Sequence, residues 1–373
     1  MVSLRAFLLL AETVVAVSLK PRDWFGPTAI SIPPSQSWTG NDGPWSSFTL
    51  RVGTPAQKVG VLISTAGFET WVVTPEGCTH NDPPDCPTLR GGLYDNSASS
   101  TWQPQNFHPL GLESVLGYSS GGEYGFDTVG LGWQESGPVL THQVVAGMAT
   151  SEFYLGTFGI SPGPSNLSDP SGQKSSFLVG LKQNGTIPSL SWGYTAGARY
   201  RLSKVLGSLT LGGYDLSRFT PNNLTFPFGI GNSDDLTVGI QSITMSSSDE
   251  QDTPLLPNPI LAFIDSTIPH LWLPKEACAK FESAFGLTWD NASQLYLVDD
   301  KLHSSLLAKN PSVTFKLSLA SKGGPSIDIV LPYAAFDLEV ESPLLKRPTK
   351  YFPLKRAEND TQYTLGRTFL QEA

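Results

Sequence analysis

Hydrophobic residues occur along this chain in short runs separated by turn-forming residues. Phe48–Val52 and Val59–Ile63 are two such runs, and Ser208–Leu211, flanked by glycines, is a third. Short apolar runs bounded by Gly, Pro, Asn and Ser are typical of β-strands. Helical periodicity is clearest in Glu276–Phe285, which is short. The pattern therefore predicts an all-β protein with few helices.

Two segments of the chain repeat one pattern and align without a gap. They are Val61–Val73 and Ala262–Pro274, and each reads as an apolar strand, a tight polar loop and a second strand that carries Trp. Asp265 heads the loop of the second segment, where the first has Ser64. Paired loops of this kind commonly let two carboxylates share one proton. This chain supplies only one of them.

Chain length, composition and net charge limit the classes of protein to which this chain can belong. The chain has 373 residues, enough for two domains or one large bilobal domain, and a net charge of −9. No basic stripe exists to neutralise phosphates, so nucleic acid is excluded as a partner. No apolar run reaches the length of a membrane-spanning helix.

The N-terminal residues and the glycosylation motifs indicate export. Residues 1–18 combine Arg5 with the apolar run Ala6–Ala11, which predicts a signal peptide; a buried N-terminal strand is the alternative. Residues 19–44 form a Pro- and Ser-rich lead-in with little regular pattern. We therefore expect a secreted glycoprotein. Its five Asn-X-Ser/Thr motifs begin at Asn166, Asn184, Asn223, Asn291 and Asn359.

The cysteines and histidines do not form a metal motif. Cys78 and Cys86 are close enough in sequence to close a small disulfide loop in an oxidising compartment. Cys278 lacks an obvious partner, which predicts a buried free thiol. The five histidines are scattered, so we expect neither a metal nor another cofactor.

In this order, the motifs resemble those of the pepsin-type aspartic peptidases, and look most similar to divergent secreted members from filamentous fungi. The resemblance covers nearly the whole chain after residue 44. Ser64–Gly67 lies where the family carries its first Asp-Thr-Gly-Ser, and Asp265–Ile268 lies at the second such motif. Cys78 and Cys86 fall where many members close a disulfide loop. The other matching segments are Trp45–Gln57, Phe126–Val129, Phe153–Ile160, Gly207–Asp215, Ile240–Met245 and Leu365–Leu370.

The resemblance implies an all-β, bilobal pepsin-like fold with two lobes of the six-stranded-barrel type, related by a pseudo-twofold axis. The lobes are expected over 45–217 and 218–373, with a peptide or protein ligand in the cleft between them, in a monomer. Family members continue for further strands after Leu370, so the second lobe is expected to be truncated at Ala373, with an unpaired strand edge.

The site implied by the resemblance departs from the family at several positions. In the family, two carboxylates about 3 Å apart share a proton and activate a water. Ser64 cannot replace a carboxylate, because its hydroxyl does not titrate near working pH. Ala66 and Thr267 replace the loop glycines, and Ile268 and Pro269 replace small or hydroxylated residues.

Other positions of the implied site are kept. Thr65 and Ser266 retain the hydroxyls that join the two loops, and with Thr267 they are the expected ligand-contacting loop residues. Tyr118 is the candidate tyrosine of the flap that closes over a ligand, although an ordinary hairpin tyrosine is the alternative. We therefore expect a pepsin-fold homologue with impaired or absent catalysis that binds peptides.

Two alternatives remain open. One is an active endopeptidase in which Asp265 works with a non-standard partner, either Ser64 through a water or His270. The other is a glycosidase-inhibitor or cell-wall binding protein on the same fold, which the fold permits and no particular residue supports.

Overall fold

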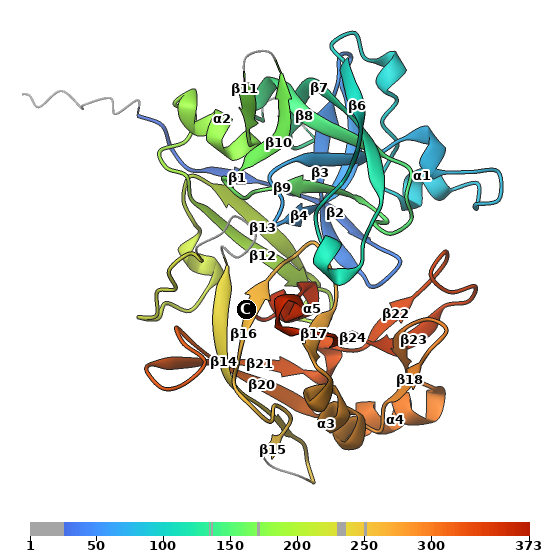
Figure 1. Ribbon diagram of the computed structural model, residues 1–373, viewed down its shortest axis with the longest axis vertical. Coiled ribbons are helices and arrows are strands. Elements are labelled where there is room, and N and C mark those ends of the chain that lie inside the picture. Colours follow the sequence, from blue (N-terminus) through green and yellow to red (C-terminus); the bar gives the residue numbers. More distant parts are fainter. Residues whose placement is uncertain (1–25, 134, 136, 170–171, 230–235, 250–251) are drawn as a thin grey trace, which may run out of the picture.

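The predicted apolar runs form the strands of two β-lobes that lie one above the other in the computed structural model (Figure 1). The structure describes residues 26–133, 135, 137–169, 172–229, 236–249 and 252–373. The predicted signal peptide lies outside the described residues. The architecture is the expected bilobal, mostly β fold with few helices.

The N-terminal lobe is built on a sheet with strand order β2-β3-β4-β9-β5-β8-β7-β6, in which β3 also pairs with β7. Its strands are β2 (Pro34–Thr39), β3 (Trp45–Val52), β4 (Gln57–Ser64), β5 (Thr70–Val73), β6 (Gln103–Pro109), β7 (Gly121–Leu131), β8 (Val139–Met148) and β9 (Gly156–Gly159). The lobe also contains the hairpin β10 (Pro164–Asp169) and β11 (Gly172–Ser175), and the helices α1 (Cys86–Leu89) and α2 (Phe177–Gln183).

The C-terminal lobe is built on a second sheet, with strand order β21-β20-β14-β16-β25-β17-β24 and β15 paired to β14. These strands are β14 (Thr237–Ser246), β15 (Thr253–Pro254), β16 (Ile260–Ile264), β17 (Leu271–Pro274), β20 (Ser312–Ser318), β21 (Ser326–Pro332), β24 (Leu354–Ala357) and β25 (Thr364–Leu365). The main sheet of each lobe therefore has eight hydrogen-bonded strands, because short outer strands such as β2 and β15 extend it.

Smaller elements complete the C-terminal lobe and join it to the other. A four-stranded sheet runs β18-β19-β23-β22. Its strands are β18 (Thr288–Asp290), β19 (Leu295–Leu297), β22 (Leu338–Val340) and β23 (Thr349–Phe352). The helices are α3 (Lys275–Phe285), α4 (Asp300–Lys309) and α5 (Arg367–Leu370). Between the lobes lies a three-stranded sheet of β1 (Ile30–Ile32), β13 (Val205–Leu211) and β12 (Trp192–Ala198), visible in Figure 1.

The sequence repeat is a repeat of structure. In the first lobe β4 runs parallel to β9, and β9 pairs antiparallel with β5; in the second lobe β16, β25 and β17 pair in the same way. Gly159 and Gly366 stand at the ends of the middle strands. A Cβ at Gly366 would lie 2.4 Å from the carbonyl oxygen of His270, so the chain crossing here requires glycine.

Each lobe has its own hydrophobic core. The core of the C-terminal lobe includes Phe281, Phe315 and Phe352, and a core of the N-terminal lobe includes Phe48 and Phe158. Cys278 is buried in the first of these cores as a free thiol. Cys278, Phe281 and Phe285 lie on the buried face of α3, so the helix that the periodicity predicted at Glu276–Phe285 is confirmed.

Three elements, the strands β1 and β2 and the helix α4, differ from the sequence prediction. The lead-in 19–44 contains strands β1 and β2, which pair with β13 and β3 at sheet edges. An edge strand needs only one hydrogen-bonded neighbour, so its sequence carries little alternating pattern. Helix α4 was not predicted, because few of its side chains are buried, Leu306 among them.

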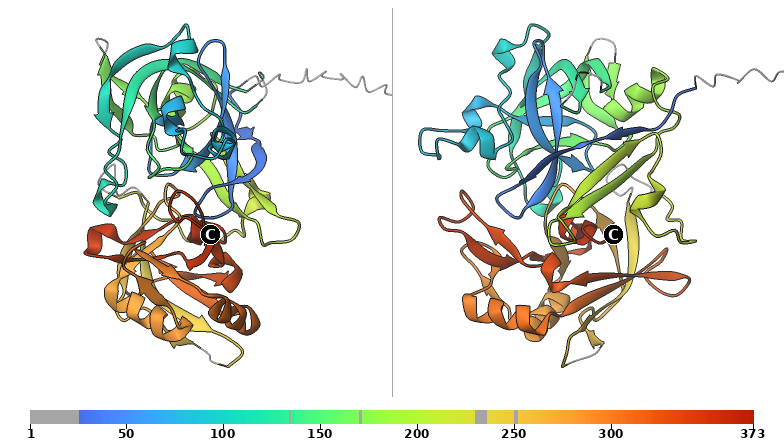
Figure 2. Two further views of the ribbon diagram at one scale, coloured as in Figure 1. Left: turned by 90° about the vertical axis from the view of Figure 1, so that its right-hand side faces the viewer. Right: turned by 180° about the vertical axis from the view of Figure 1, so that it is seen from behind.

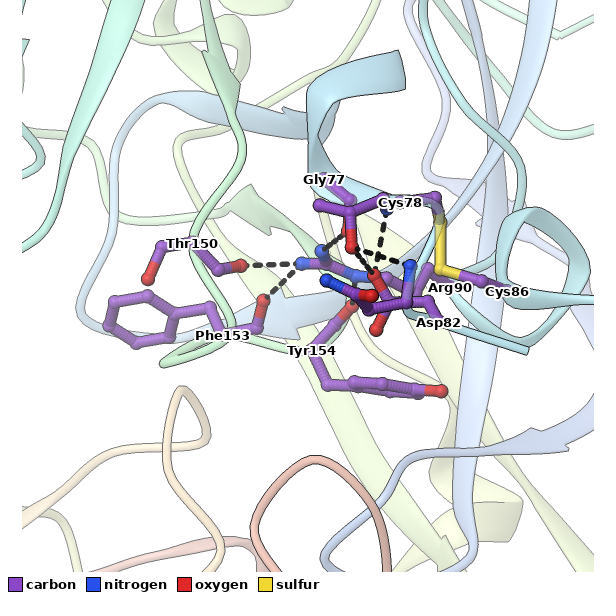
Figure 3. Close-up of a disulfide and its surroundings, with 10 residues drawn as sticks. Gly77, Cys78, Asp82, Cys86, Arg90, Thr150, Phe153 and Tyr154 are labelled. Carbon is purple, nitrogen blue, oxygen red and sulfur yellow. Dashed lines mark hydrogen bonds between the residues drawn. A yellow bond between two sulfur atoms is a disulfide. The ribbon is translucent and has the colours of Figure 1, made fainter. Parts of the chain in front are cut away.

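The loop closed by the disulfide Cys78–Cys86 packs on a buried arginine, shown in Figure 3. The Arg90 guanidinium donates hydrogen bonds to four carbonyl oxygens, at 2.6 to 3.0 Å. They belong to Gly77, Thr150, Phe153 and Tyr154. Arg90 is 3 % exposed, so these carbonyls satisfy a cation that water does not reach.

We predict that Arg90→Met destabilises the fold by about 3 kcal/mol or more, because several buried carbonyls lose their donor. Arg90→Lys should recover only part of the loss, since an ammonium lacks the planar fork of a guanidinium. Urea unfolding followed by circular dichroism measures both changes. A loss below about 0.5 kcal/mol in Arg90→Met would contradict this account.

Candidate functional site

The two repeated loops meet at the centre of the molecule, each held by the parallel strand beside it. Ser64 ends β4, and its carbonyl oxygen accepts a hydrogen bond of 3.0 Å from the amide of Ile160. Asp265 follows β16, and its amide donates to the carbonyl of Leu365 at 3.1 Å. Both positions are therefore fixed by backbone ladders rather than by free loops.

Reciprocal hydrogen bonds join the two loops. The Thr65 amide donates to Ser266 Oγ at 2.9 Å, and the Ser266 amide donates to Thr65 Oγ1 at 3.0 Å. Ser266 Oγ in turn donates to the carbonyl of Ile63 at 2.7 Å. All of these groups are buried, so the hydroxyl lattice expected at this place is present as architecture.

Ser64 is fully engaged in this lattice. Its hydroxyl oxygen accepts from the Gly67 amide at 2.7 Å and is hydrogen-bonded to Thr267 Oγ1, also at 2.7 Å. The side chain has no exposed surface. A hydroxyl in this setting stays neutral, orders the loop and supplies no negative charge.

Asp265 is the carboxylate of the paired loops. Oδ1 accepts from the Thr267 amide at 2.8 Å, and the residue has no exposed surface. Oδ2 is buried, and the described part of the chain offers it no amide or hydroxyl donor. A buried oxygen of this kind has a strong need for a proton donor.

Glu113 meets this need, and sequence analysis missed it. The side chain is 8 % exposed and lies close enough to Asp265 for the two carboxyl groups to interact. Burial, the charge of Asp265 and hydrogen bonding to Asp265 raise the pKa of Glu113 well above its usual value, in that order of effect. Glu113 therefore keeps its proton to a higher pH than an ordinary glutamate does, and the protonated carboxyl group is able to donate to Asp265. The sequence marks Glu113 only as the one acidic residue in the segment 104–122, which does not tell a buried acid from an exposed one.

Arg367 holds the second loop from behind. Its Nη1 donates to the carbonyl oxygens of Ser266 at 3.1 Å and Thr267 at 2.6 Å. Its Nη2 pairs with Asp42 of the N-terminal lobe at 3.2 Å, and the guanidinium lies 4.8 Å from the centre of the Trp45 ring. One buried cation thus ties the loop of one lobe to the other lobe.

His270, the histidine that followed Asp265 in sequence, is buried in an apolar position. Its ring packs edge-on against Tyr351 with centroids 5.9 Å apart. Burial first, and then the charges of Lys355 and Arg367, hold the pKa of His270 well below its usual range. Among the described residues, neither ring nitrogen has a hydrogen-bond partner, so His270 is not bonded to Asp265. A neutral imidazole of this kind is a structural residue.

Tyr118 lies in the connection between β6 and β7, near Glu113. Its ring stacks on Phe153 at 5.1 Å, and burial raises the pKa of its hydroxyl above the usual value. A role in covering a ligand stays a prediction. No group of three or more His, Cys, Asp or Glu residues with metal-binding geometry occurs among the described residues.

Comparison with known proteins gives a consistent picture. The family model described as eukaryotic aspartyl protease matches residues 47–373. The chain is 26 % identical over 286 residues to secreted aspartic protease 8 of Candida albicans, covering 74 % of this chain and 65 % of that protein. It is 27 % identical over 258 residues to a probable aspartic-type endopeptidase of Arthroderma benhamiae, covering 67 % of this chain and 50 % of that protein. The chain thus spans less than two thirds of the length of these curated relatives.

A solved structure supports the fold. The crystal structure of the aspartic proteinase from Irpex lacteus superimposes with a TM-score of 0.58, at 20 % identity, covering 92 % of each chain. In the described part of this chain, no helix has the length and apolar character needed to cross a membrane.

We predict that Ser64→Ala destabilises the fold by about 1–3 kcal/mol, because the buried Gly67 amide loses its acceptor. In a double-mutant cycle with Thr267→Val, chemical denaturation should give a coupling energy of about 0.5–3 kcal/mol. Ser217→Ala, at an exposed hydroxyl bonded to Asp215, is the control and should cost less than about 0.5 kcal/mol. Zero coupling would contradict a shared hydrogen bond.

We also predict that Glu113 makes the fold less stable as pH rises. Its folded-state pKa lies above the ordinary value of 4.5, so the folded state holds the proton more tightly than the unfolded chain. The stabilisation is complete below pH 4.5 and is lost as pH rises through the folded-state pKa. The difference in unfolding free energy between the wild type and Glu113→Gln, measured at several pH values, isolates this effect. A difference that does not change with pH would contradict it.

Proposed function

The chain belongs to the eukaryotic aspartyl protease family, and from this premise we propose that it is a secreted homologue that binds peptides between its lobes without hydrolysing them. The single observation that carries the proposal is Ser64, whose hydroxyl is fully hydrogen-bonded at the position of the missing carboxylate. Hydrolysis of a peptide bond by an aspartic dyad needs one group that removes a proton from the water and another that donates a proton to the substrate.

The chemical argument concerns the general base. Asp265 is one carboxyl group at the end of a rigid strand, and the neighbouring loop provides the Ser64 hydroxyl, bonded to Thr267, instead of a second carboxyl group. Loss of a general base alone slows a reaction by about 10²–10⁴, and groups that act as a unit lose more. Thr65 and Ser266 keep the loops in place, so the fold is retained while this chemistry is lost.

A second candidate function has one observation in its favour. The carboxyl group of Glu113 lies close enough to Asp265 to interact with it, so the two form a pair of acids that can share a proton, as a hydrolytic dyad does. However, Glu113 comes from the hairpin that covers the loops. Because it lies against Asp265, it would have to move before a substrate carbonyl and a water could reach that carboxylate. Residual hydrolysis by this pair therefore ranks below binding.

Space for a ligand exists beside the loops. A cavity of about 1,110 Å³ lies between the lobes, lined by residues of both, among them Asn41, Tyr154 and Glu341. The residues that line it do not include Ser64, Glu113 or Asp265. This cavity is thus separate from the covered carboxylate, and its volume is large enough for a peptide segment.

Secretion is supported by three features. The loop that the Cys78–Cys86 disulfide closes suits an oxidising compartment. Asn184, Asn223, Asn291 and Asn359 are exposed, as glycan acceptors must be, whereas the Asn166 side chain lies outside the described part. The curated relatives include a secreted protease.

We predict that the purified protein does not detectably cleave a broad peptide library between about pH 3 and 6, where acid peptidases work. The same library supplies the binding measurement, by capture of peptides on immobilised protein. Asp265→Ala is the matched variant, and pepstatin is added to parallel samples. Cleavage by the wild type that disappears in Asp265→Ala would overturn the proposal and support the second candidate. Failure to retain any peptide would remove the binding function.

A further inference from the structure

The hairpin that carries Glu113 is closed onto both lobes. We call β6, residues 110–120 and β7 the flap hairpin, and its tip contains the short helix η3 (Ser114–Leu116). Gln362 of the C-terminal lobe donates through Nε2 to the carbonyl oxygen of Val115 at 2.5 Å. The left view of Figure 2 shows the tip reaching the C-terminal lobe.

The N-terminal lobe holds the other side of the same tip. The Glu152 carboxylate accepts hydrogen bonds from the amides of Ser119 at 3.2 Å and Ser120 at 3.1 Å. Leu112 lies over the first loop, since a Cβ added at Gly67 would be 3.4 Å from its Cδ2. The tip thus spans the interval between the lobes directly above the paired loops.

Glu113 is held in this closed tip in an unusual backbone conformation. Its φ of 62° and ψ of 16° are left-handed, a region that residues with a Cβ seldom adopt. This conformation directs a charged residue type into the interior, where it is more than nine-tenths buried. Its neighbour there is Asp265, whose Oδ2 finds no amide or hydroxyl donor in the described ranges. The left-handed backbone at Glu113 thus places its carboxyl group beside that of Asp265.

We propose that Glu113 is a proton-operated latch: its protonated carboxyl group bridges to Asp265 and closes the flap hairpin, and loss of that proton opens the cleft to a peptide. The peptide part of this inference rests on the proposed function. The latch itself is a property of the chain alone, without any ligand.

The direction of the switch follows from the two charge states. With a proton, Glu113 donates one hydrogen bond to the Asp265 carboxylate, and both groups remain buried. Without it, two negative charges face each other away from water, where repulsion is strong. The proton goes to solvent, and the flap hairpin relieves the repulsion by lifting. Acid pH therefore closes the cleft, and a peptide that needs the floor of the cleft enters more easily as pH rises.

The other charged groups around the tip do not reverse this direction. Arg367 is committed to the carbonyls of Ser266 and Thr267 and to Asp42, so it leaves Glu113 without a compensating cation. The raised pKa of Tyr118 and the lowered pKa of His270 keep both side chains neutral over the same range. Glu152 binds the outer side of the tip and adds a further negative charge.

Distance measurements between spin labels test the latch in the unliganded protein. One label is placed at Val115→Cys, which is exposed on the tip, and one at Lys280→Cys, which is exposed on α3. Between about pH 4.5 and 8 we expect a narrow short distance to give way to a longer, broader one. For release of one proton, the ratio of open to closed molecules should rise by about tenfold per pH unit above the midpoint.

Three variants decide whether Glu113 is responsible. Glu113→Gln, which mimics the protonated side chain, should stay closed at every pH. Asp265→Asn should weaken the pH response, because the repelling partner is gone. Glu123→Gln alters an exposed carboxylate of β7 that bonds to Asn96, and it should titrate like the wild type. If Glu113→Gln does not fold, the wild-type titration and Asp265→Asn still decide the question.

A distance that does not change with pH, or a Glu113→Gln variant that opens like the wild type, would overturn the latch. These outcomes are distinct from failure of the proposed function, because no peptide is present. Binding of fluorescein-labelled pepstatin, a peptide analogue, then links the two. With a working latch its affinity should rise with pH in the wild type and be independent of pH in Glu113→Gln.

Discussion

The reciprocal hydrogen bonds between Thr65 and Ser266 are the constraint on which the rest of the site depends. Each backbone amide donates to the hydroxyl of the other loop, so neither loop can move without leaving a buried donor unsatisfied. This fixes the ends of β4 and β16 against each other and thereby brings the two lobes into one frame. These bonds involve the Thr65 and Ser266 hydroxyls and backbone amides, so they do not require a carboxylate at the head of the first loop.

Removal of one carboxylate from a rigid frame changes what the remaining one requires. Asp265 keeps a fixed position and a buried oxygen that needs a donor, but the neighbouring loop offers only hydroxyls that are already bonded. The donor comes instead from Glu113, on a hairpin rather than on the floor of the cleft. When two carboxyl groups on fixed loops share a proton, they can transfer it to a substrate. When Asp265 shares a proton with Glu113 on the flap hairpin, that proton controls the position of the hairpin instead.

Two buried arginines hold separate segments of the chain together by donating hydrogen bonds to backbone carbonyls that water does not reach. Arg367 donates to the carbonyls of the second loop and pairs with Asp42 of the other lobe. Arg90 donates to the carbonyls around the disulfide loop. In both cases a guanidinium supplies several directed donors from one planar group, which suits backbone oxygens that converge from different segments. In the site itself, the Nη atoms of Arg367 are bonded to these carbonyls and to Asp42 rather than to Glu113.

The sequence by itself determined the β-class, the repeat of the two loops and the disulfide, because these follow from local patterns and from motifs in order. It did not reveal strand β1, whose pairing partner β13 is distant in sequence, or strand β2, which is paired at the edge of its sheet. Nor did it reveal Glu113, since nothing near Leu112–Ser114 distinguishes a solvent-facing acid from one turned inward. Only the tertiary structure placed that carboxyl group beside Asp265, because burial and proximity set its protonation and both arise when the flap hairpin closes.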